Sequence, residues 1–259
     1  MEIITIQGRK MAYKETGKGK TIVLIHGFCG SAEYWGKVVP LLKDFHVLAI
    51  ELRGHGQTGF NGEPFMMEDL ADDIHLLLME KGLKNVYMLG HSLGGYVALA
   101  FAELFPSALA GFGLVHSTAY PDTEEGKAGR LKAIEKIQDA GIAGFVDGLI
   151  PNLFSDEALQ GMPEEVEKAK EIGYGTDTVA AMETLSAMRK RIDRNHIIAN
   201  SQVPVLIVKG TKDKVVPLDR AASASGNHVT VADLETGHMS MMENPEALFG
   251  AIKAFIETN

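Results

Sequence analysis

The stretch "NVYMLGHSLGGYVALAF", Asn85 to Phe101, runs from an apolar segment of strand length through Gly-His-Ser-Leu-Gly-Gly into an apolar segment of helical length. Gly90 and Gly94 stand two residues on either side of Ser92, where side chains would collide as a strand folds directly into a helix. A serine before an apolar helix is most often an N-cap. The flanking glycines favour a strained turn that lifts the hydroxyl clear of the backbone, and we interpret Ser92 as a nucleophile.

Apolar segments of strand length alternate with helical patterns along the rest of the chain. "IITI" and "MAYKE" predict an antiparallel pair, and further strands are expected at 21–27, 46–51, 85–90, 111–116, 204–210 and 228–234. Nearly continuous apolar strands imply burial on both faces and hence a parallel sheet. Helices are expected at 32–43, 66–81, 93–105, 219–225 and 245–256. The sequence predicts a doubly wound α/β fold with a mainly parallel, eight-stranded sheet.

The interval 119–200 interrupts this alternation, because it is far longer than a usual crossover connection. It reads as several helices. Thr123 is expected to cap one, 142–150 to form a short apolar piece, Pro163 to open another helix, and Thr176 to cap the helix in "DTVAAMETLSAMRKR". We interpret 119–200 as a helical cap inserted into a core formed by 1–118 and 201–259.

Residues that directly follow the strands carry the chemistry, because ligands bind beyond the carboxyl ends of a parallel sheet. Ser92, Asp213 and His238 each follow a different strand, in that chain order. His238 would remove the proton of Ser92, and Asp213 would orient the imidazole. Asp is also a common turn residue in a segment such as "TKDK", and Asp122 is the alternative acid.

Backbone amides near Ser92 supply a candidate oxyanion hole. The N–H of Leu93 opens the helix after the serine, and an N–H from "HGFCG", assigned to Phe28, would complete the pair. Each such donor contributes about 3 kcal/mol to stabilising a tetrahedral intermediate. We therefore expect acyl transfer at this edge of the sheet.

The segments "LIHGFCG", "ELRGHGQT", "GHSLGG", "VKGTKDKVVP" and "TGHMSMMENPE" together resemble the α/β-hydrolase superfamily, in its capped esterase and lipase branch. The resemblance runs nearly end to end. Glu51 and Thr58 depart from the Asp and Ser that are common in the family, at positions that look structural there. The resemblance implies a serine carboxylesterase that uses no cofactor and cleaves small to medium carboxylic esters through an acyl-enzyme.

Other reactions and another class of protein remain open. The same triad supports lactonase, thioesterase, carbon–carbon bond hydrolase and perhydrolase activities. Serine rather than aspartate at the turn argues against haloalkane dehalogenase and epoxide hydrolase chemistry. Some proteins that resemble this chain are small-molecule receptors with slow turnover, and a structural protein with an inactive site is the third alternative.

Several other residues have competing interpretations. We expect His91 to pack beside the turn rather than to act as the base, and His26 and His55 to be hydrogen-bonded structural residues. His116 ends a strand and is a candidate for contact with the pocket. Cys29 has no acid–base pair of its own in the sequence, so we expect a small buried filler.

Two further groups lie in or near the cap. The "MRKR" cluster, 188–191, either interacts with solvent and a helix dipole or clamps a substrate carboxylate, and we favour the first. Methionines are ordinary core fillers or an adaptable wall for an apolar acyl group. The residues concerned are Met162, Met182, Met188, Met239, Met241 and Met242.

Composition limits the partners. With 259 residues and 46% hydrophobic residues, the chain can form one domain with an insertion. A formal net charge of −9 argues against nucleic acid and anionic membranes, which leaves small molecules as partners. The predicted triad makes a small-molecule ester the expected substrate. The sequence has no apolar run long enough to span a membrane and no signal peptide, so we expect the mature chain to start at Met1.

The single cysteine, Cys29, excludes an internal disulfide and favours a reducing, cytoplasmic location. The chain has neither an H-E-x-x-H sequence nor a set of cysteine ligands, so we expect no metal and no other cofactor. We expect a monomer or a homodimer.

Overall fold

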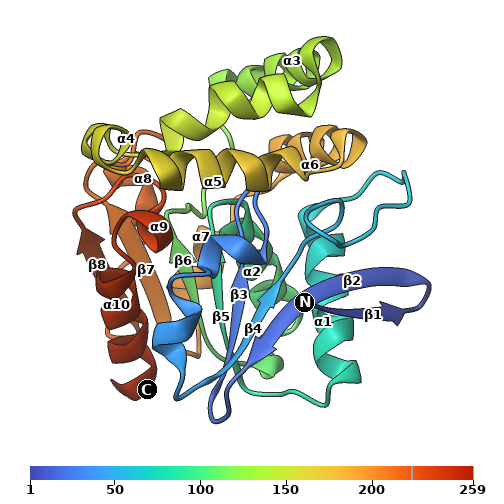
Figure 1. The fold of residues 1–259 in the computed structure, drawn as a ribbon. Coiled ribbons are helices and arrows are strands. Elements are labelled where there is room, and N and C mark those ends of the chain that lie inside the picture. Colours follow the sequence, from blue (N-terminus) through green and yellow to red (C-terminus); the bar gives the residue numbers. More distant parts are fainter. Residues whose placement is uncertain (223, 259) are drawn as a thin grey trace.

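A twisted sheet of eight strands forms the centre of the protein, as the computed structural model of residues 1–222 and 224–258 shows (Figure 1). The strand order is β1-β2-β4-β3-β5-β6-β7-β8. The bounds are β1 Glu2–Ile6, β2 Arg9–Thr16, β3 Thr21–Ile25, β4 His46–Ile50, β5 Val86–His91, β6 Leu109–Val115, β7 Val205–Gly210 and β8 Val229–Leu234.

The sheet is parallel from β4 to β8 and antiparallel at the amino-terminal edge. β1 pairs with β2, and β2 with β4, in antiparallel register, whereas every later pair is parallel. The central strands β3 and β5 are buried along their whole length. This burial on both faces is the reason for their continuous apolar sequences, and the predicted fold is confirmed.

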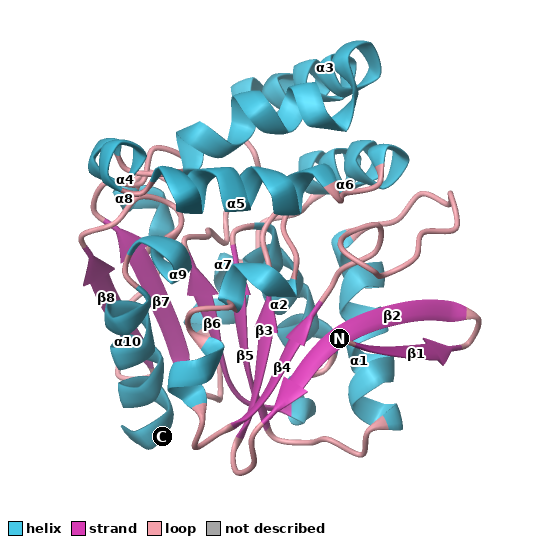
Figure 2. Cartoon of the chain, in the orientation of Figure 1, coloured by secondary structure: helices cyan, strands magenta, loops and turns pink. Residues whose placement is uncertain are grey.

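Helices cover both faces of the sheet (Figures 1 and 2). α1 (Met67–Glu80) packs against α2 (Leu93–Leu104) on one face, and α10 (Pro245–Thr258) packs against β7 and β8 together with a 3₁₀ turn at Val39–Leu42 on the other. Short helices are also present: α7 Asn195–Ala199, α8 Leu218–Ala221 and α9 Ser240–Glu243. Across the described chain, no helix combines the length and apolar character needed to cross a membrane.

A separate layer of helices lies above the carboxyl ends of the strands (Figure 1). It consists of α3 (Glu124–Leu149), α4 (Asp156–Gly161), α5 (Pro163–Tyr174) and α6 (Thr178–Lys190). α3 packs against both α5 and α6. These helices all fall within the predicted cap, although the boundaries of a separate cap at 119 and 200 stay a prediction.

The prediction of one helix at 32–43 is wrong. The structure has two 3₁₀ turns, Ala32–Trp35 and Val39–Leu42. Gly36 follows the first turn, and Pro40 lacks the N–H that a continuing helix would use. The tertiary burial of Trp35 and Leu42, rather than helical periodicity, explains the apolar positions.

Three predictions about helix ends need adjustment. The 142–150 piece is the second half of α3, which bends at Gly141 (φ 71°). Asp177, not Thr176, caps α6 by accepting the N–H of Ala180. The predicted helix at 219–225 is the shorter α8, and residue 223 of that range lies outside the described residues. Thr123 and Pro163 open α3 and α5 as expected.

Candidate active site

Ser92 occupies a strained turn between β5 and α2. Its backbone has φ 50° and ψ −112°, a conformation that costs a non-glycine residue about 1–3 kcal/mol. The turn is held on both sides, because the Ser92 N–H donates to the carbonyl of Val115 (2.9 Å) and the Ser92 carbonyl accepts from Gly95 N–H (2.9 Å) and Ser117 Oγ (2.7 Å). The Ser92 hydroxyl makes no capping hydrogen bond, so it is not an N-cap side chain.

The two flanking glycines are required by close backbone approach. A Cβ on Gly90 would collide with the carbonyl of Gly94. A Cβ on Gly94 would come within 2.5 Å of the Ile25 carbonyl oxygen and 2.8 Å of that of His26. Gly90 and Gly94 therefore allow β5 to turn into α2 against the end of β3, as predicted.

Asp213 and His238 are hydrogen-bonded to each other above the same edge of the sheet. Asp213 follows β7 and His238 follows β8, and Asp213 Oδ2 lies 2.8 Å from His238 Nδ1. The other carboxylate oxygen, Oδ1, accepts the backbone N–H groups of Val215 (2.7 Å) and Val216 (3.0 Å). Both side chains are at most 2% exposed.

Burial alone would raise the pKa of Asp213, but the interactions with His238 and His116 outweigh burial and hold that pKa well below its usual range. The carboxylate therefore stays ionised. An ionised carboxylate bonded to Nδ1 fixes the tautomer of an imidazole and leaves Nε2 free to accept a proton.

The described contacts include no hydrogen bond between Ser92 Oγ and the His238 ring. Hydrogen bonds between a nucleophile and its base often shorten only when substrate binds. The backbone of His238 is fixed by two contacts: its carbonyl accepts His91 Nε2–H (2.9 Å), and its N–H donates to the carbonyl of Leu153 (2.8 Å), just before α4.

The "HGFCG" loop lies directly beside Ser92. A Cβ on Gly27 would come 3.3 Å from the Cβ of Ser92. Leu93 is the first residue of α2, a position whose N–H has no partner within the helix. The ring of Phe28 packs edge-on against Phe145 of α3, with 5.9 Å between centroids. An oxyanion hole formed by the N–H groups of Phe28 and Leu93 stays a prediction.

His116 lies closer to the candidate acid than the sequence indicates. Its Nδ1 lies 3.4 Å from Asp213 Oδ2, and its Nε2 lies 2.7 Å from Ser240 Oγ. The ring is fully buried, 5.7 Å from the ring of His238 between centroids. His116 directly follows β6, so the rule that selected Ser92, Asp213 and His238 would have selected it as well.

The other histidines near the site are structural, as expected. His91 is buried with its ring 4.9 Å from that of His238, and burial, followed by the neighbouring rings, holds its pKa well below the usual value. His26 donates from Nδ1 to the Gly27 carbonyl and accepts the N–H of Leu52 at Nε2. Burial lowers the pKa of His26 to about 3 and that of His55 to about 4.

Asp122 is paired with two arginines. Arg191 Nη1 lies 2.8 Å from Asp122 Oδ1, and Arg130 Nε lies 3.2 Å from Oδ2. Arg191 is 7% exposed, lies 4.1 Å from the ring centroid of Tyr96 and donates to the carbonyl of Met188 at the end of α6. The expected contact with the helix end is present, but the expectation of a solvated charge is wrong for Arg191.

Glu51, Thr58 and Cys29 occupy structural positions. Glu51 is 2% exposed and accepts the N–H of Gln57, and Thr58 Oγ1 donates to the Glu51 carbonyl (2.7 Å). Cys29 is fully buried, and burial raises the pKa of its thiol. The three methionines expected beside His238, Met239, Met241 and Met242, belong to the hydrophobic core, as does Met188 of α6, and all four are at most 2% exposed.

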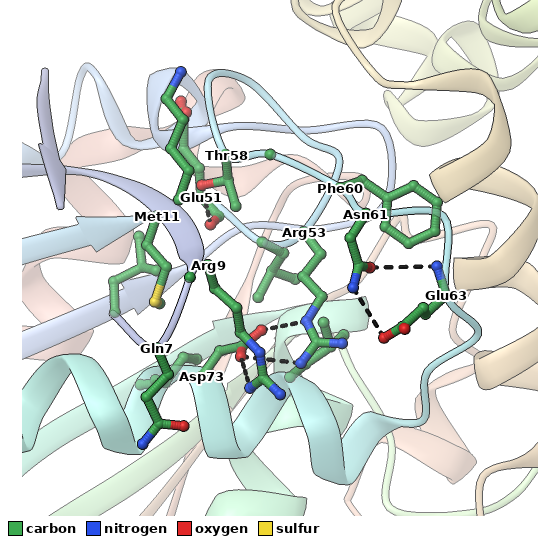
Figure 3. A pocket seen from close by; sticks show the side chains of 17 residues that line it. Gln7, Arg9, Met11, Glu51, Arg53, Thr58, Phe60, Asn61, Glu63 and Asp73 are labelled. Atoms are coloured by element: carbon green, nitrogen blue, oxygen red, sulfur yellow. Dashed lines mark hydrogen bonds and ion pairs between the residues drawn. The ribbon is translucent and has the colours of Figure 1, made fainter. Parts of the chain in front are cut away.

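The larger of the two cavities described lies away from Ser92 and shares no residue with the proposed site. It has a volume of about 470 Å³ and is formed by β2, the loop after β4 and α1. Figure 3 shows that Arg9 and Arg53 converge there on Asp73. Because Asp73 satisfies both arginines, this ion-pair cluster joins the amino-terminal hairpin to α1.

His116, Asp213 and His238 could also hold a metal ion. Each offers one ligand atom, and these atoms lie within 4.8 Å of one another. The short hydrogen-bond distance between Asp213 and His238 and the burial of all three side chains equally fit a proton-bonded cluster.

Comparison with known proteins is consistent with this geometry. The family model described as "alpha/beta hydrolase fold" matches residues 20–245. A thermophilic esterase from Thermogutta terrifontis, solved with malate bound, is 28% identical and superposes with a TM-score of 0.93 over 100% of this chain and 99% of the esterase. The enol-lactonase of Burkholderia xenovorans LB400, 20% identical over 99% of this chain and 100% of that chain with a TM-score of 0.91, shares the fold.

A curated relative, the dihydrolipoyllysine-residue acetyltransferase component of an acetoin cleaving system of Pseudomonas putida, is 29% identical over 97% of this chain and 68% of its own length. Together the similarities support a hydrolase that acts on esters in general. The chain belongs to the α/β hydrolase fold family.

Proposed function

We propose that this protein is a serine carboxylesterase that cleaves small to medium carboxylic esters through an acyl-enzyme. The observation that carries the proposal is the hydrogen bond between Asp213 and His238 above the sheet edge at which the strained turn presents Ser92. Ser92 is partly exposed, whereas its neighbours His91 and Leu93 are buried. A reachable hydroxyl and a buried, oriented imidazole are what nucleophilic catalysis requires.

The reaction proceeds in two halves. His238 Nε2 takes the proton of Ser92 as Oγ attacks the ester carbonyl, and the N–H groups of Phe28 and Leu93 stabilise the oxyanion. Collapse of the intermediate expels the alcohol, which receives the proton from His238. Water then attacks the acyl-enzyme by the same route and releases the acid. No cofactor takes part in this proposal.

The test is turnover of p-nitrophenyl esters with acyl chains of graded length. We expect many turnovers per enzyme with the wild-type protein and none above background with Ser92→Ala. Ser107→Ala is the matched control, because Ser107 is exposed and remote in the fold from the strained turn, and it should keep wild-type rates. Equal activity of the Ser92 and Ser107 variants would contradict the proposal.

The same experiment separates the esterase from the receptor alternative. A receptor with slow turnover would give one stoichiometric burst of p-nitrophenol and then stop, whereas an esterase continues. Lactone, thioester and perhydrolase substrates at equal concentration then rank the remaining activities on the same residues. A cytoplasmic location and a monomeric or homodimeric state complete the proposal.

A further inference from the structure

Four nitrogen atoms approach the carboxylate of Asp213, and only one of them belongs to the expected base. Oδ1 accepts two backbone N–H groups, and Oδ2 faces the Nδ1 atoms of both His238 (2.8 Å) and His116 (3.4 Å). An ionised carboxylate only accepts hydrogen bonds. His116 Nδ1 is buried and has no hydrogen-bond partner among the described residues, and the Asp213 carboxylate is the acceptor that it faces. A stabilising contact between the two therefore requires a proton on His116 Nδ1.

We propose that His116 is a positioning residue for the reaction: it donates its Nδ1–H to Asp213 and thereby fixes the carboxylate that orients His238. The inference rests on the proposed function and adds a second imidazole to the Ser92, His238 and Asp213 set. His116 acts through Asp213 and does not touch the substrate.

The ring of His116 is held in place from both sides. Its backbone N–H donates to the carbonyl of Val208 (2.9 Å), so the end of β6 is tied to β7. Gly210, opposite the ring, leaves space for it, because a Cβ there would come 2.9 Å from His116 Cε1. The backbone of His116 has φ 49°, a strained conformation for a residue other than glycine.

The protonation state follows from burial and from the partners. The ring is fully buried, and burial lowers the pKa of His116. The groups that face it are His91, His238, Asp213 and Glu243. A neutral ring with its proton on Nδ1 has an acceptor at Nε2, so the hydroxyl of Ser240, 2.7 Å away, donates to it.

The hydrogen bond between His116 Nε2 and Ser240 Oγ connects the end of β6 to the segment that carries His238. Ser240 lies two residues after His238, in α9. His116 thus contacts the acid through one nitrogen and the His238 segment through the other. Losing the Nδ1–H donor would leave Asp213 less well oriented and more basic, and a more basic carboxylate stabilises the protonated form of His238.

The test compares His116→Gln with His116→Asn. The amide nitrogen of Asn can occupy the place of Nδ1 and donate to Asp213, whereas Gln reaches only toward the place of Nε2. We expect His116→Gln to lower kcat about 10- to 100-fold, the effect of one hydrogen bond to a charged group. KM should stay within about twofold, because His116 contacts no substrate. His116→Asn should recover most of kcat.

The pH profile adds a readout that a purely structural role would not move. In His116→Gln the acid limb of kcat/KM should shift to higher pH, and in His116→Asn it should stay near the wild-type position. Thermal unfolding of both variants shows whether they fold. If Gln does not fold, Ser240→Ala replaces it, with an expected decrease of a few-fold in kcat and the same direction of shift.

A measurement independent of activity is the ¹⁵N-histidine NMR spectrum of the wild-type protein. Two Nδ1–H signals are expected next to Asp213, one from His116 and one from His238, and His116→Asn should remove the signal of His116. Protonation of His116 on Nε2, or equal kcat and pH profiles for the Asn and Gln variants, would overturn the inference. Lack of ester turnover by the wild-type protein would overturn the proposed function instead, and the NMR signals would still decide the hydrogen bond.

Discussion

Asp73 and Asp213 are both buried aspartates that face two nitrogen-bearing side chains, yet they lie in sites of different character. Arg9 and Arg53 hold Asp73 on α1, beside β2. Asp213 follows β7, which lies in the other half of the strand order from β2, and it faces His116 and His238. A guanidinium keeps its proton at every physiological pH, whereas an imidazole can exchange one.

The comparison shows that the donor, rather than the buried carboxylate, decides what such a site can do. Two permanently charged arginines make the Asp73 cluster a fixed ion-pair connection between the hairpin and α1. Two imidazoles make the Asp213 cluster one in which a proton can move while the carboxylate stays ionised.

Replacing the acid at the histidine site should have the largest effect. Asp213→Asn should lower kcat by about 10³- to 10⁴-fold, because an amide no longer fixes the productive tautomer of His238. Steady-state kinetics with a p-nitrophenyl ester measure it. Asp122→Asn is the control, and its folded fraction should keep near-normal kcat. Activity lost in the Asp122 variant and kept in the Asp213 variant would make Asp122 the acid.

The corresponding change at the arginine site should affect stability and not chemistry. Asp73→Asn leaves the largely buried guanidinium of Arg53 without its charged partner, which costs about 3–5 kcal/mol of unfolding free energy. Urea unfolding measures this loss, and kcat of the folded protein should stay within about twofold. A large decrease in kcat with unchanged stability would show that the two sites do not differ as described.

Acid should weaken the fold through the buried histidines. Because the pKa values of His26 and His55 are lowered to about 3 and 4, the unfolded chain takes up protons first as pH falls below about 6.5. The contribution of these histidines to the free energy of unfolding should be fully present above that pH. It should decrease toward pH 4, by about 1.4 kcal/mol per pH unit for each such histidine.

Unfolding curves at several pH values measure this slope. His55→Gln should reduce the slope by the amount that corresponds to at most one proton taken up on unfolding. His196→Gln should leave the slope unchanged, because the His196 side chain is 56% exposed. An unchanged slope in the His55 variant would contradict burial of a neutral ring at that position.

The smallest effect is expected for Arg9→Gln. The Arg9 side chain is 45% exposed, and exposed ion pairs contribute about 0–1 kcal/mol. Urea unfolding at low salt should show that Arg9→Gln lowers the free energy of unfolding by about this amount. At high salt, which screens the ion pair of the wild-type protein, the two proteins should be equally stable. A loss comparable with that of Asp73→Asn would mean that Arg9, and not Arg53, is the principal partner of Asp73.

The sheet and the turn at Ser92 were predictable because local sequence determines them. β3 and β5 are continuous apolar segments. Gly90 and Gly94 stand where the Cβ of any other residue would collide with nearby backbone atoms. The prediction failed at 32–43, where apolar residues serve tertiary burial within two 3₁₀ turns rather than one helical face.

The contacts of the candidate site were harder to predict, because they join segments distant in sequence. The approach of His116 to Asp213, and of Arg191 to Asp122, depends on how β6, β7 and the helical layer pack. The sequence shows that Asp213 follows a strand, but it does not show which second imidazole the carboxylate would face. No sequence motif identifies the residues that would surround the substrate.

Labelling with a fluorophosphonate, followed by peptide mapping, tests most directly whether Ser92 is a nucleophile activated by His238. We predict one adduct, on Ser92, that forms at least about 10³-fold more slowly in His238→Ala, because the hydroxyl has lost its base. An adduct on another residue, or an equal rate of labelling in the two proteins, would contradict it.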